Sequence, residues 1–205
     1  LWQTIGNGEP FREVFINRTK IGTLYYEEKT ITPLKDVRGI VTHFVSTGKD
    51  ITDRMRSDQE ARQLQHFLNS VVENLPNMLF VKDAKDLTFV RLNRAAEELL
   101  GYSRAELLGK SGHDFFPKKE ADFFAAMDHE VLTSGELVDI PREPIHTRHR
   151  GTRLLHTKKI PISDEHGQPL YLLGISEDIT ERVQAEDRAA RLGRILERSS
   201  NEIYV

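Results

Sequence analysis

The histidines are the first residues to consider for chemistry, because the chain has eight of them and no cysteine. His146 and His149 lie three residues apart in a strand-like segment, so their side chains point to opposite faces. No His-Glu-x-x-His pair occurs in the sequence. The pattern therefore predicts no metal site. The lack of cysteine also excludes disulfides, thiolate nucleophiles and cysteine-linked chromophores.

Basic side chains gather in a predicted hairpin that runs from Arg148 to Arg153 and is followed by Lys158 and Lys159. This hairpin lacks the interleaved aromatic residues on which nucleic-acid bases stack, so we expect a solvated hairpin and no nucleic-acid partner. The sequence has no glycine-rich phosphate loop after a strand, and no Gly-x-Ser-x-Gly elbow. We therefore expect no catalytic residues.

The composition is that of a globular protein. Of the 205 residues, 30% are charged and 38% hydrophobic, and the net charge is −3. No apolar stretch approaches the roughly 20 residues that span a bilayer. We expect a cytoplasmic protein of one or two domains. Because the sequence starts at Leu1 rather than Met, we also expect it to belong to a longer chain.

The sequence repeats itself with an offset of 128 residues. Asp50-Ile51-Thr52-Asp53-Arg54 recurs as Asp178-Ile179-Thr180-Glu181-Arg182. A repeat of this length indicates tandem copies of one domain. We expect the C-terminal half of a first copy at 1–51, a linker helix at 52–76, a complete copy at 77–180, a second linker helix at 181–199 and the start of a further copy at 200–205.

The complete copy begins with a predicted hairpin and short helices. The apolar run at 78–83 and the alternation at 87–93 indicate two strands. Asn93 is placed to cap a short helix that Gly101 ends. Ser103 and Glu106 form a capping box for a second short helix, which Gly109 ends.

A longer helix and three strands follow. The segment from Pro117 to Thr133 carries Phe124, Met127 and Val131 on one helical face. Strand-like stretches occupy about 138–149, 152–162 and 169–177. This order predicts an α+β domain, in which short helices cover one face of a five-stranded antiparallel sheet.

The segments between the copies are predicted to be amphipathic helices. Their apolar residues alternate in steps of three and four, which is a heptad seam; they are Ala61, Leu64, Leu68, Val71 and Leu75, and later Ala189, Leu192 and Leu196. Two interpretations are open. Each helix packs on its own domain, or pairs of helices form a parallel coil that joins successive domains in a dimer.

These residues resemble the PAS/PAC sensor family. The resemblance rests on the element order, the stretch from Gly167 to Ile175, the segment Asp114 to Pro117 and the repeated Asp-Ile-Thr ending. It implies a sensory PAS module of a multidomain bacterial signalling protein, whose linker helices relay a signal to a histidine kinase or a diguanylate cyclase. The alternative is a ligand-free module for dimerisation or protein interaction. Either role implies a homodimer through linker helices and PAS surfaces.

The resemblance also places a ligand pocket. By similarity to flavin-binding PAS members, one set of alternating side chains in each of the last three strands faces a pocket under the helices. The ligand-binding residues expected from this register are His146, Arg148, Leu155, Thr157, Lys159, Leu172, Gly174 and Ser176, with Phe124 and Met127 from the long helix.

The two cations in this set determine the charge of the ligand that the pocket would favour. If Arg148 and Lys159 face inward, an anionic ligand or a buried carboxylate must neutralise them. We therefore expect a small carboxylate or similar anion as the ligand. The alternative is that both side chains extend to solvent at the edge of the sheet.

The cofactor stays unknown at this point. Light-oxygen-voltage flavin photochemistry needs a cysteine, which the chain lacks. Haem-binding PAS domains use a histidine on the long helix. His129 lies there between Asp128 and Glu130, so we expect an exposed side chain and no haem.

The Asp-Ile-Thr ending lies where a strand becomes a helix. Asp178 or Thr180 can accept hydrogen bonds from the first amides of that helix, and Arg182 is expected to reach Asp178. A shift of the strand would then pass to the helix. The alternative is an ordinary helix cap. The residues expected to relay a signal are Asp178, Ile179, Thr180 and Arg182, with Asp50 and Thr52 in the first copy.

Overall fold

A computed structural model describes residues 1–199. The segment 200–205, predicted to begin a further domain, lies outside the described residues. The chain divides into two compact units, one formed by residues 1–68 and one that begins at Asn69.

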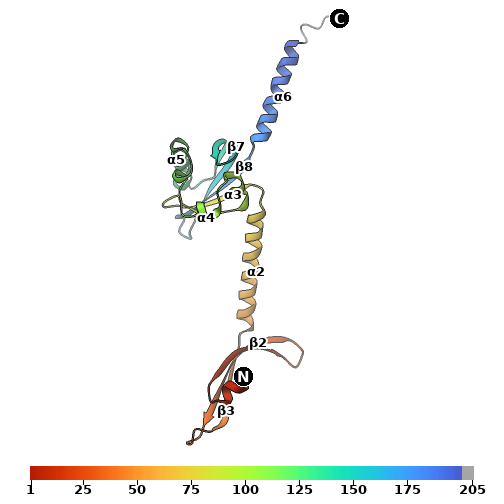
Figure 1. Cartoon of the computed structure of the whole chain (residues 1–205), viewed down its shortest axis with the longest axis vertical. Helices are drawn as coiled ribbons and strands as arrows, with labels where there is room; N and C mark the ends of the chain where they lie inside the picture. The colour runs from red at the N-terminus through yellow and green to blue at the C-terminus, as the bar shows by residue number, and fades with distance from the viewer. Residues whose placement is uncertain (200–205) are drawn as a thin grey trace. The chain divides into compact units, whose positions relative to one another are not determined.

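The first unit is a small antiparallel sheet (Figure 1). Its strands are β1 (Phe11–Arg18), β2 (Leu24–Lys35) and β3 (Val41–Asp50), with β2 in the centre. The short helix α1 (Trp2–Gly6) packs against β2 and buries Ile5. Directly after β3 the chain enters α2 (Thr52–Asn74).

The second unit contains the predicted five-stranded sheet, with strands in the order β5-β4-β8-β7-β6 and all pairs antiparallel. The strands are β4 (Met78–Asp83), β5 (Phe89–Leu92), β6 (Val138–Thr147), β7 (Gly151–Ser163) and β8 (Pro169–Asp178). The helices are α3 (Arg94–Leu100), α4 (Arg104–Leu107), the 3-10 turn η1 (Gly112–Asp114) and α5 (Lys118–Ser134), with α6 (Thr180–Ser199) after the last strand. The predicted α+β class is confirmed.

The limits of the short helices follow the predicted capping residues. The Asn93 side chain accepts a hydrogen bond from the amide of Ala96, and Gly101 ends α3 with a left-handed φ of 81°. Ser103 and Glu106 form the predicted capping box of α4. Asn93 also accepts a bond from the amide of Leu79, so this fully buried side chain ties the start of α3 to β4.

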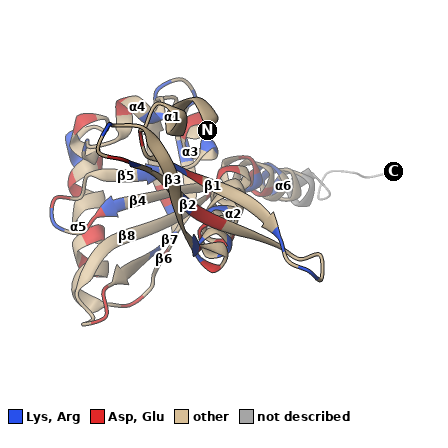
Figure 2. Cartoon of the chain, turned by 90° about the horizontal axis from the view of Figure 1, so that it is seen from below, with Lys and Arg blue, Asp and Glu red and all other residues tan. Residues whose placement is uncertain are grey.

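The core of the second unit lies between the sheet and the helices. On β4, Met78 and Phe80 are buried on one face of the sheet, and Leu172 on β8 belongs to the same cluster. The helices contribute Leu99, Leu100, Leu107, Phe124 and Val131. Charged residues of both signs are interspersed along α5 (Figure 2), which covers β7 and β8.

The apolar seam of α2 is exposed. Leu64, Leu68 and Val71 keep 59%, 52% and 44% of their surface accessible in the single chain. The interpretation that these residues pack on their own domain is therefore wrong for this part of the helix.

Candidate functional site

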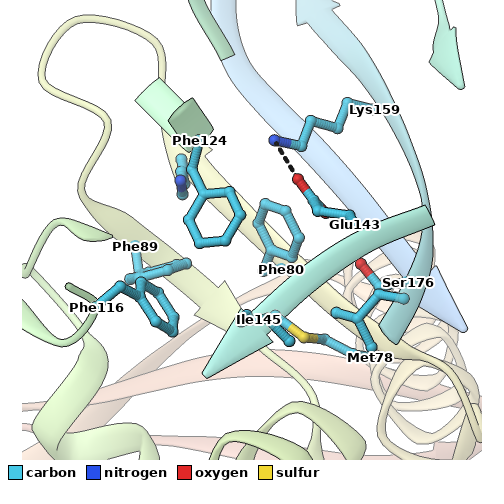
Figure 3. A pocket seen from close by; sticks show the side chains of 11 residues that line it. Met78, Phe80, Phe89, Phe116, Phe124, Glu143, Ile145, Lys159 and Ser176 are labelled. Carbon is cyan, nitrogen blue, oxygen red and sulfur yellow. Dashed lines mark ion pairs between the residues drawn. The ribbon is translucent and has the colours of Figure 1, made fainter. Parts of the chain in front are cut away.

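A small cavity lies between the sheet and α5, with a volume of about 30 Å³. Four phenylalanine rings, those of Phe80, Phe89, Phe116 and Phe124, gather around it (Figure 3). Met78 and Ile145 close one side, and the polar lining residues are Lys82, Glu143, Lys159 and Ser176. The volume exceeds the roughly 10–15 Å³ that a cavity needs to hold one water molecule. A ligand of several heavy atoms would still require lining side chains to move.

A buried ion cluster forms the polar wall of this cavity. The Asp128 carboxylate on α5 accepts hydrogen bonds from Lys82 Nζ at 2.5 Å and from Lys159 Nζ at 2.7 Å. Lys159 Nζ also lies 3.7 Å from Glu143 Oε1 on β6, the ion pair marked in Figure 3. All four side chains are at most 6% exposed.

The cluster is neutral when all its groups are ionised, because two ammonium groups face two carboxylates. Burial lowers the pKa of Lys82, and the attraction of Asp128 offsets this effect only in part. Burial by itself raises the pKa of Asp128, but the two lysine charges together outweigh it and hold that pKa below its ordinary value. Asp128 therefore stays ionised and compensates both lysines.

A second cavity, of about 240 Å³, lies on the other side of this cluster. The turn between β4 and β5, the 3-10 turn η1 and α5 form its walls. Lys82 and Phe124 line both cavities. These two side chains therefore separate the smaller inner cavity from the larger outer one.

Most of the predicted inward register is confirmed. Leu155, Thr157 and Lys159 on β7 are at most 2% exposed, and Leu172, Gly174 and Ser176 on β8 are buried as well. The Thr157 and Ser176 hydroxyl groups lie 2.9 Å apart. A Cβ atom on Gly174 would lie 2.0 Å from Phe80 Cζ, so only glycine leaves room for this ring.

The predicted inward position of His146 and Arg148 is wrong. Both side chains are exposed, and Glu143 and Ile145 face the core in their place. A register irregularity between Ile140 and Glu143 shifts the alternation of β6 by one residue. His146 instead pairs with Glu120 of α5. Arg148 lies beyond the end of β6 and pairs with Glu106 at 3.0 Å.

Met127 does not line the inner cavity, although Phe124 does. The buried stripe of α5 runs through Ala121, Phe124, Asp128 and Val131, and Met127 lies half-buried at its margin. The predicted exposure of His129 is confirmed.

Sequence reasoning missed Lys82, Asp128 and Glu143. Strand alternation from Met78 and Phe80 places Lys82 on the core face, so this signal was available. The burial of Asp128 and Glu143 becomes apparent only with the fold, because isolated carboxylates in a charged sequence are normally solvated.

The Asp-Ile-Thr ending makes the same contacts in both units. Asp178 Oδ1 accepts hydrogen bonds from the amide and the hydroxyl of Thr180, and Thr180 Oγ1 accepts one from the amide of Leu154 at 2.8 Å. In the first unit, Asp50 accepts the same bonds from Thr52, and Thr52 Oγ1 accepts one from the amide of Tyr26 at 2.9 Å. Tyr26 precedes Leu154 by the same 128 residues.

These contacts refine the predicted cap. Asp178 caps the first amide of α6 as expected, whereas the Thr180 hydroxyl binds the backbone of β7 and fixes the start of α6 to the sheet. The predicted pair between Arg182 and Asp178 is wrong. Arg182 lies 3.8 Å from Glu177, and Asp178 lies 3.7 Å from Arg153.

Comparison with known proteins identifies the fold. The PAS fold family matches residues 72–184, and a second PAS domain family matches residues 1–53. Since the first match covers more than half of the chain, the protein belongs to the PAS fold family. Helices on one face of an antiparallel sheet, as described above, agree with this assignment.

Related proteins include a regulator and several solved domains. The nitrogen fixation regulatory protein of Klebsiella pneumoniae is 29% identical over 86 residues, which are 42% of this chain and 17% of that protein. The chain thus corresponds to less than a fifth of that relative's length. The PAS domain of an HTR-like protein from Haloarcula marismortui is 25% identical with a TM-score of 0.51, covering 61% of this chain and 99% of that one.

An RNA-binding light-oxygen-voltage receptor shares the fold, with a TM-score of 0.55 and 13% identity over 94% of this chain and 84% of that one. Together, the family and the related regulator support a regulatory PAS module. In the described part of the chain, no helix combines the length and apolar character needed to cross a membrane. Among the side chains that the structure describes, no group of three or more is suited to a metal ion.

Proposed function

We propose that this PAS module senses a small ligand in the cavity beside the ion cluster and relays its binding to the helix after the sheet. The observation that carries the proposal is the ion cluster itself. Three of its charged side chains, Lys82, Glu143 and Lys159, line a cavity formed by phenylalanine rings, and Asp128 pairs with both lysines. Buried charges are costly and are weak evidence for stability, and a buried charged cluster beside a cavity is a candidate functional site.

The ligand-binding residues in this proposal are those that line or support the cavity. They are Lys82, Phe124, Glu143, Leu155, Lys159 and Ser176, with Thr157, Leu172 and Gly174 supporting them from the same face of the sheet. The buried carboxylate that Lys159 requires is Asp128. An anionic ligand is therefore no longer needed to explain a buried lysine.

The relay in this proposal runs along β8. Ser176 lines the cavity, and two residues later Asp178 caps α6. Thr180 ties the start of α6 to β7, which also carries Lys159. A ligand that moves β7 relative to β8 would therefore change the position of the first turn of α6.

Mass spectrometry of the released ligand tests the sensing function. The purified chain is denatured, and the small molecules released are compared with those from Glu165→Gln, a surface variant, and from Glu143→Met, a cavity variant. We expect one compound to be released in stoichiometric amount from the wild type and from Glu165→Gln, and to be depleted in Glu143→Met. Release of nothing, together with no thermal shift from a metabolite panel, would contradict the proposal.

A ligand-free dimerisation module is the second candidate, and the exposed seam of α2 favours it. Parallel pairing of α2 in a homodimer would bury Leu64 and Leu68. Sedimentation of Leu64→Glu tests this pairing, with Gln63→Glu as a control that adds the same charge next to the seam. Loss of the dimer only in Leu64→Glu supports the coil, and a dimer that persists in both variants counts against it.

The proposal extends to the longer protein in which these units would work. The PAS units at 1–51 and 77–180, joined by the linker helices at 52–76 and 181–199, would form the cytoplasmic input part of a longer signalling protein. Its output domain would be a histidine kinase or a diguanylate cyclase, and this chain would regulate that domain without catalysing a reaction itself.

A further inference from the structure

Glu143 Oε1 is the one carboxylate oxygen in the described residues that is buried and accepts no hydrogen bond. The Glu143 side chain is 6% exposed and lines the inner cavity together with Lys159 and Ser176. The nearest ammonium group, that of Lys159, lies 3.7 Å away, which is beyond hydrogen-bonding distance. Lys159 directs its hydrogen bond to Asp128 instead. A buried acceptor without a donor is costly, so the site calls for a donor from outside the chain.

The charge of the cluster restricts what that donor can be. Lys82 and Lys159 balance Asp128 and Glu143, so the ionised cluster carries no net charge. An anion in the cavity would add an unpaired negative charge next to Glu143, and a cation would add an unpaired positive one. A neutral molecule leaves the balance intact. The phenylalanine rings supply an apolar surface for the rest of the molecule.

We propose that the cavity binds a neutral small molecule with an N–H or O–H group that donates a hydrogen bond to Glu143 Oε1. The proposal rests on the sensing function proposed above and names the chemical class of its ligand. It replaces the expected carboxylate ligand, because the structure supplies the neutralising carboxylates from Asp128 and Glu143.

Three probes of equal heavy-atom number separate the ligand classes: acetamide, which is neutral and a donor; acetate, which is an anion; and acetone, which is neutral without a donor. Each is titrated into the whole chain with ¹³C-labelled methyl groups. The signals of Met78 and Ile145 report on the cavity, since both side chains line it. We expect acetamide to shift both signals with a dissociation constant at least tenfold below those of acetate and acetone.

Variants of Glu143 test whether this acceptor sets the preference. Glu143→Met removes the acceptor and leaves the cluster with a net positive charge, so acetate should become the preferred probe. Glu143→Gln keeps an acceptor at similar volume but also leaves the cluster with a net positive charge. It should therefore still bind acetamide and bind acetate more tightly than the wild type does, even if Glu143→Met fails to fold. Glu165→Gln, which changes an exposed carboxylate, should behave as the wild type.

Three results would overturn the proposal. The first is tighter binding of acetate than of acetamide, and the second is equal binding of acetone and acetamide. The third is no shift of the Met78 or Ile145 signals with any probe, which would mean that a buried water donates to Glu143 instead. Tighter acetate binding would leave the sensing function intact and change only the ligand class. The sensing function itself is tested separately, by the compound released from the purified protein.

Discussion

Replacing Asp128 with asparagine tests the ion cluster most severely. The substitution keeps the shape of the side chain but removes the charge that faces Lys82 and Lys159. Both lysines would then depend on Glu143, which lies 3.7 Å from Lys159 Nζ. Breaking a buried ion pair by removing one partner costs about 3–5 kcal/mol. That cost is a large part of the roughly 5–15 kcal/mol by which a folded domain is stable.

The assay is urea unfolding followed at the methyl signal of Met78, because this residue lies in the core of the second unit and the chain's single tryptophan, Trp2, lies in the first. The matched control is Asp122→Asn on the same helix, whose exposed carboxylate pairs with Lys118. We expect a large loss of unfolding free energy for Asp128→Asn and a much smaller one for Asp122→Asn. Equal losses would refute the role given to Asp128.

The same variant has a predicted dependence on pH. The pKa of Asp128 is lower in the folded chain than its ordinary value of 3.8. The unfolded chain therefore takes up the proton first as the pH falls, and the stabilisation is lost as the pH drops through the folded pKa. Below about pH 5, the stability difference between the wild type and Asp128→Asn should shrink as the acid becomes stronger. A difference that grows in acid would contradict the direction of this pKa shift.

Two further substitutions test the relay and the packing of the sheet. Thr180→Val leaves the amide of Leu154 without its acceptor. The free energy of unfolding of the second unit should therefore fall by about 1–3 kcal/mol in urea, and the Leu154 amide should exchange its hydrogen faster. Unchanged exchange would show that the Thr180 hydroxyl does not hold α6 to β7. Gly174→Ala places a methyl group against the ring of Phe80, so it should lower the free energy of unfolding by about 1–3 kcal/mol or more. The control is Gly193→Ala, in open space on α6, which should raise the helicity measured by circular dichroism. Equal stability of Gly174→Ala and the wild type would contradict the close packing.

The sequence predicted those parts of the fold that depend on local patterns. The caps at Asn93 and Ser103 are set by side chains within three residues of the amides they bind, so their signals are short-range. The alternation of β7 and β8 placed Lys159 and Ser176 correctly, because each strand keeps its pleat through that region. The repeat of 128 residues likewise located Asp178, because the two repeated segments form the same strand-to-helix junction.

The positions of the other site residues depend on contacts between segments that are distant in the sequence. The irregularity in β6 reversed the faces of His146 and Glu143, and no local residue pattern marked it. Asp128 looked like part of a charged helix surface, yet it lies on the buried stripe opposite Lys82, which is 46 residues away in the sequence. A buried carboxylate is recognised only once its partner lysines are known to share its face of the core.

The most direct test of the account is hydrogen exchange of the whole chain, measured by mass spectrometry with and without a metabolite extract that yields a bound compound. We expect slower exchange in β7 and β8 and altered exchange in the first turn of α6. In Thr180→Val, the change in the strands should remain and the change in α6 should disappear, because this variant leaves the cavity intact and removes the link to β7. Protection confined to the surface of the domain, or an unchanged α6 in the wild type, would contradict a sensor that signals through this junction.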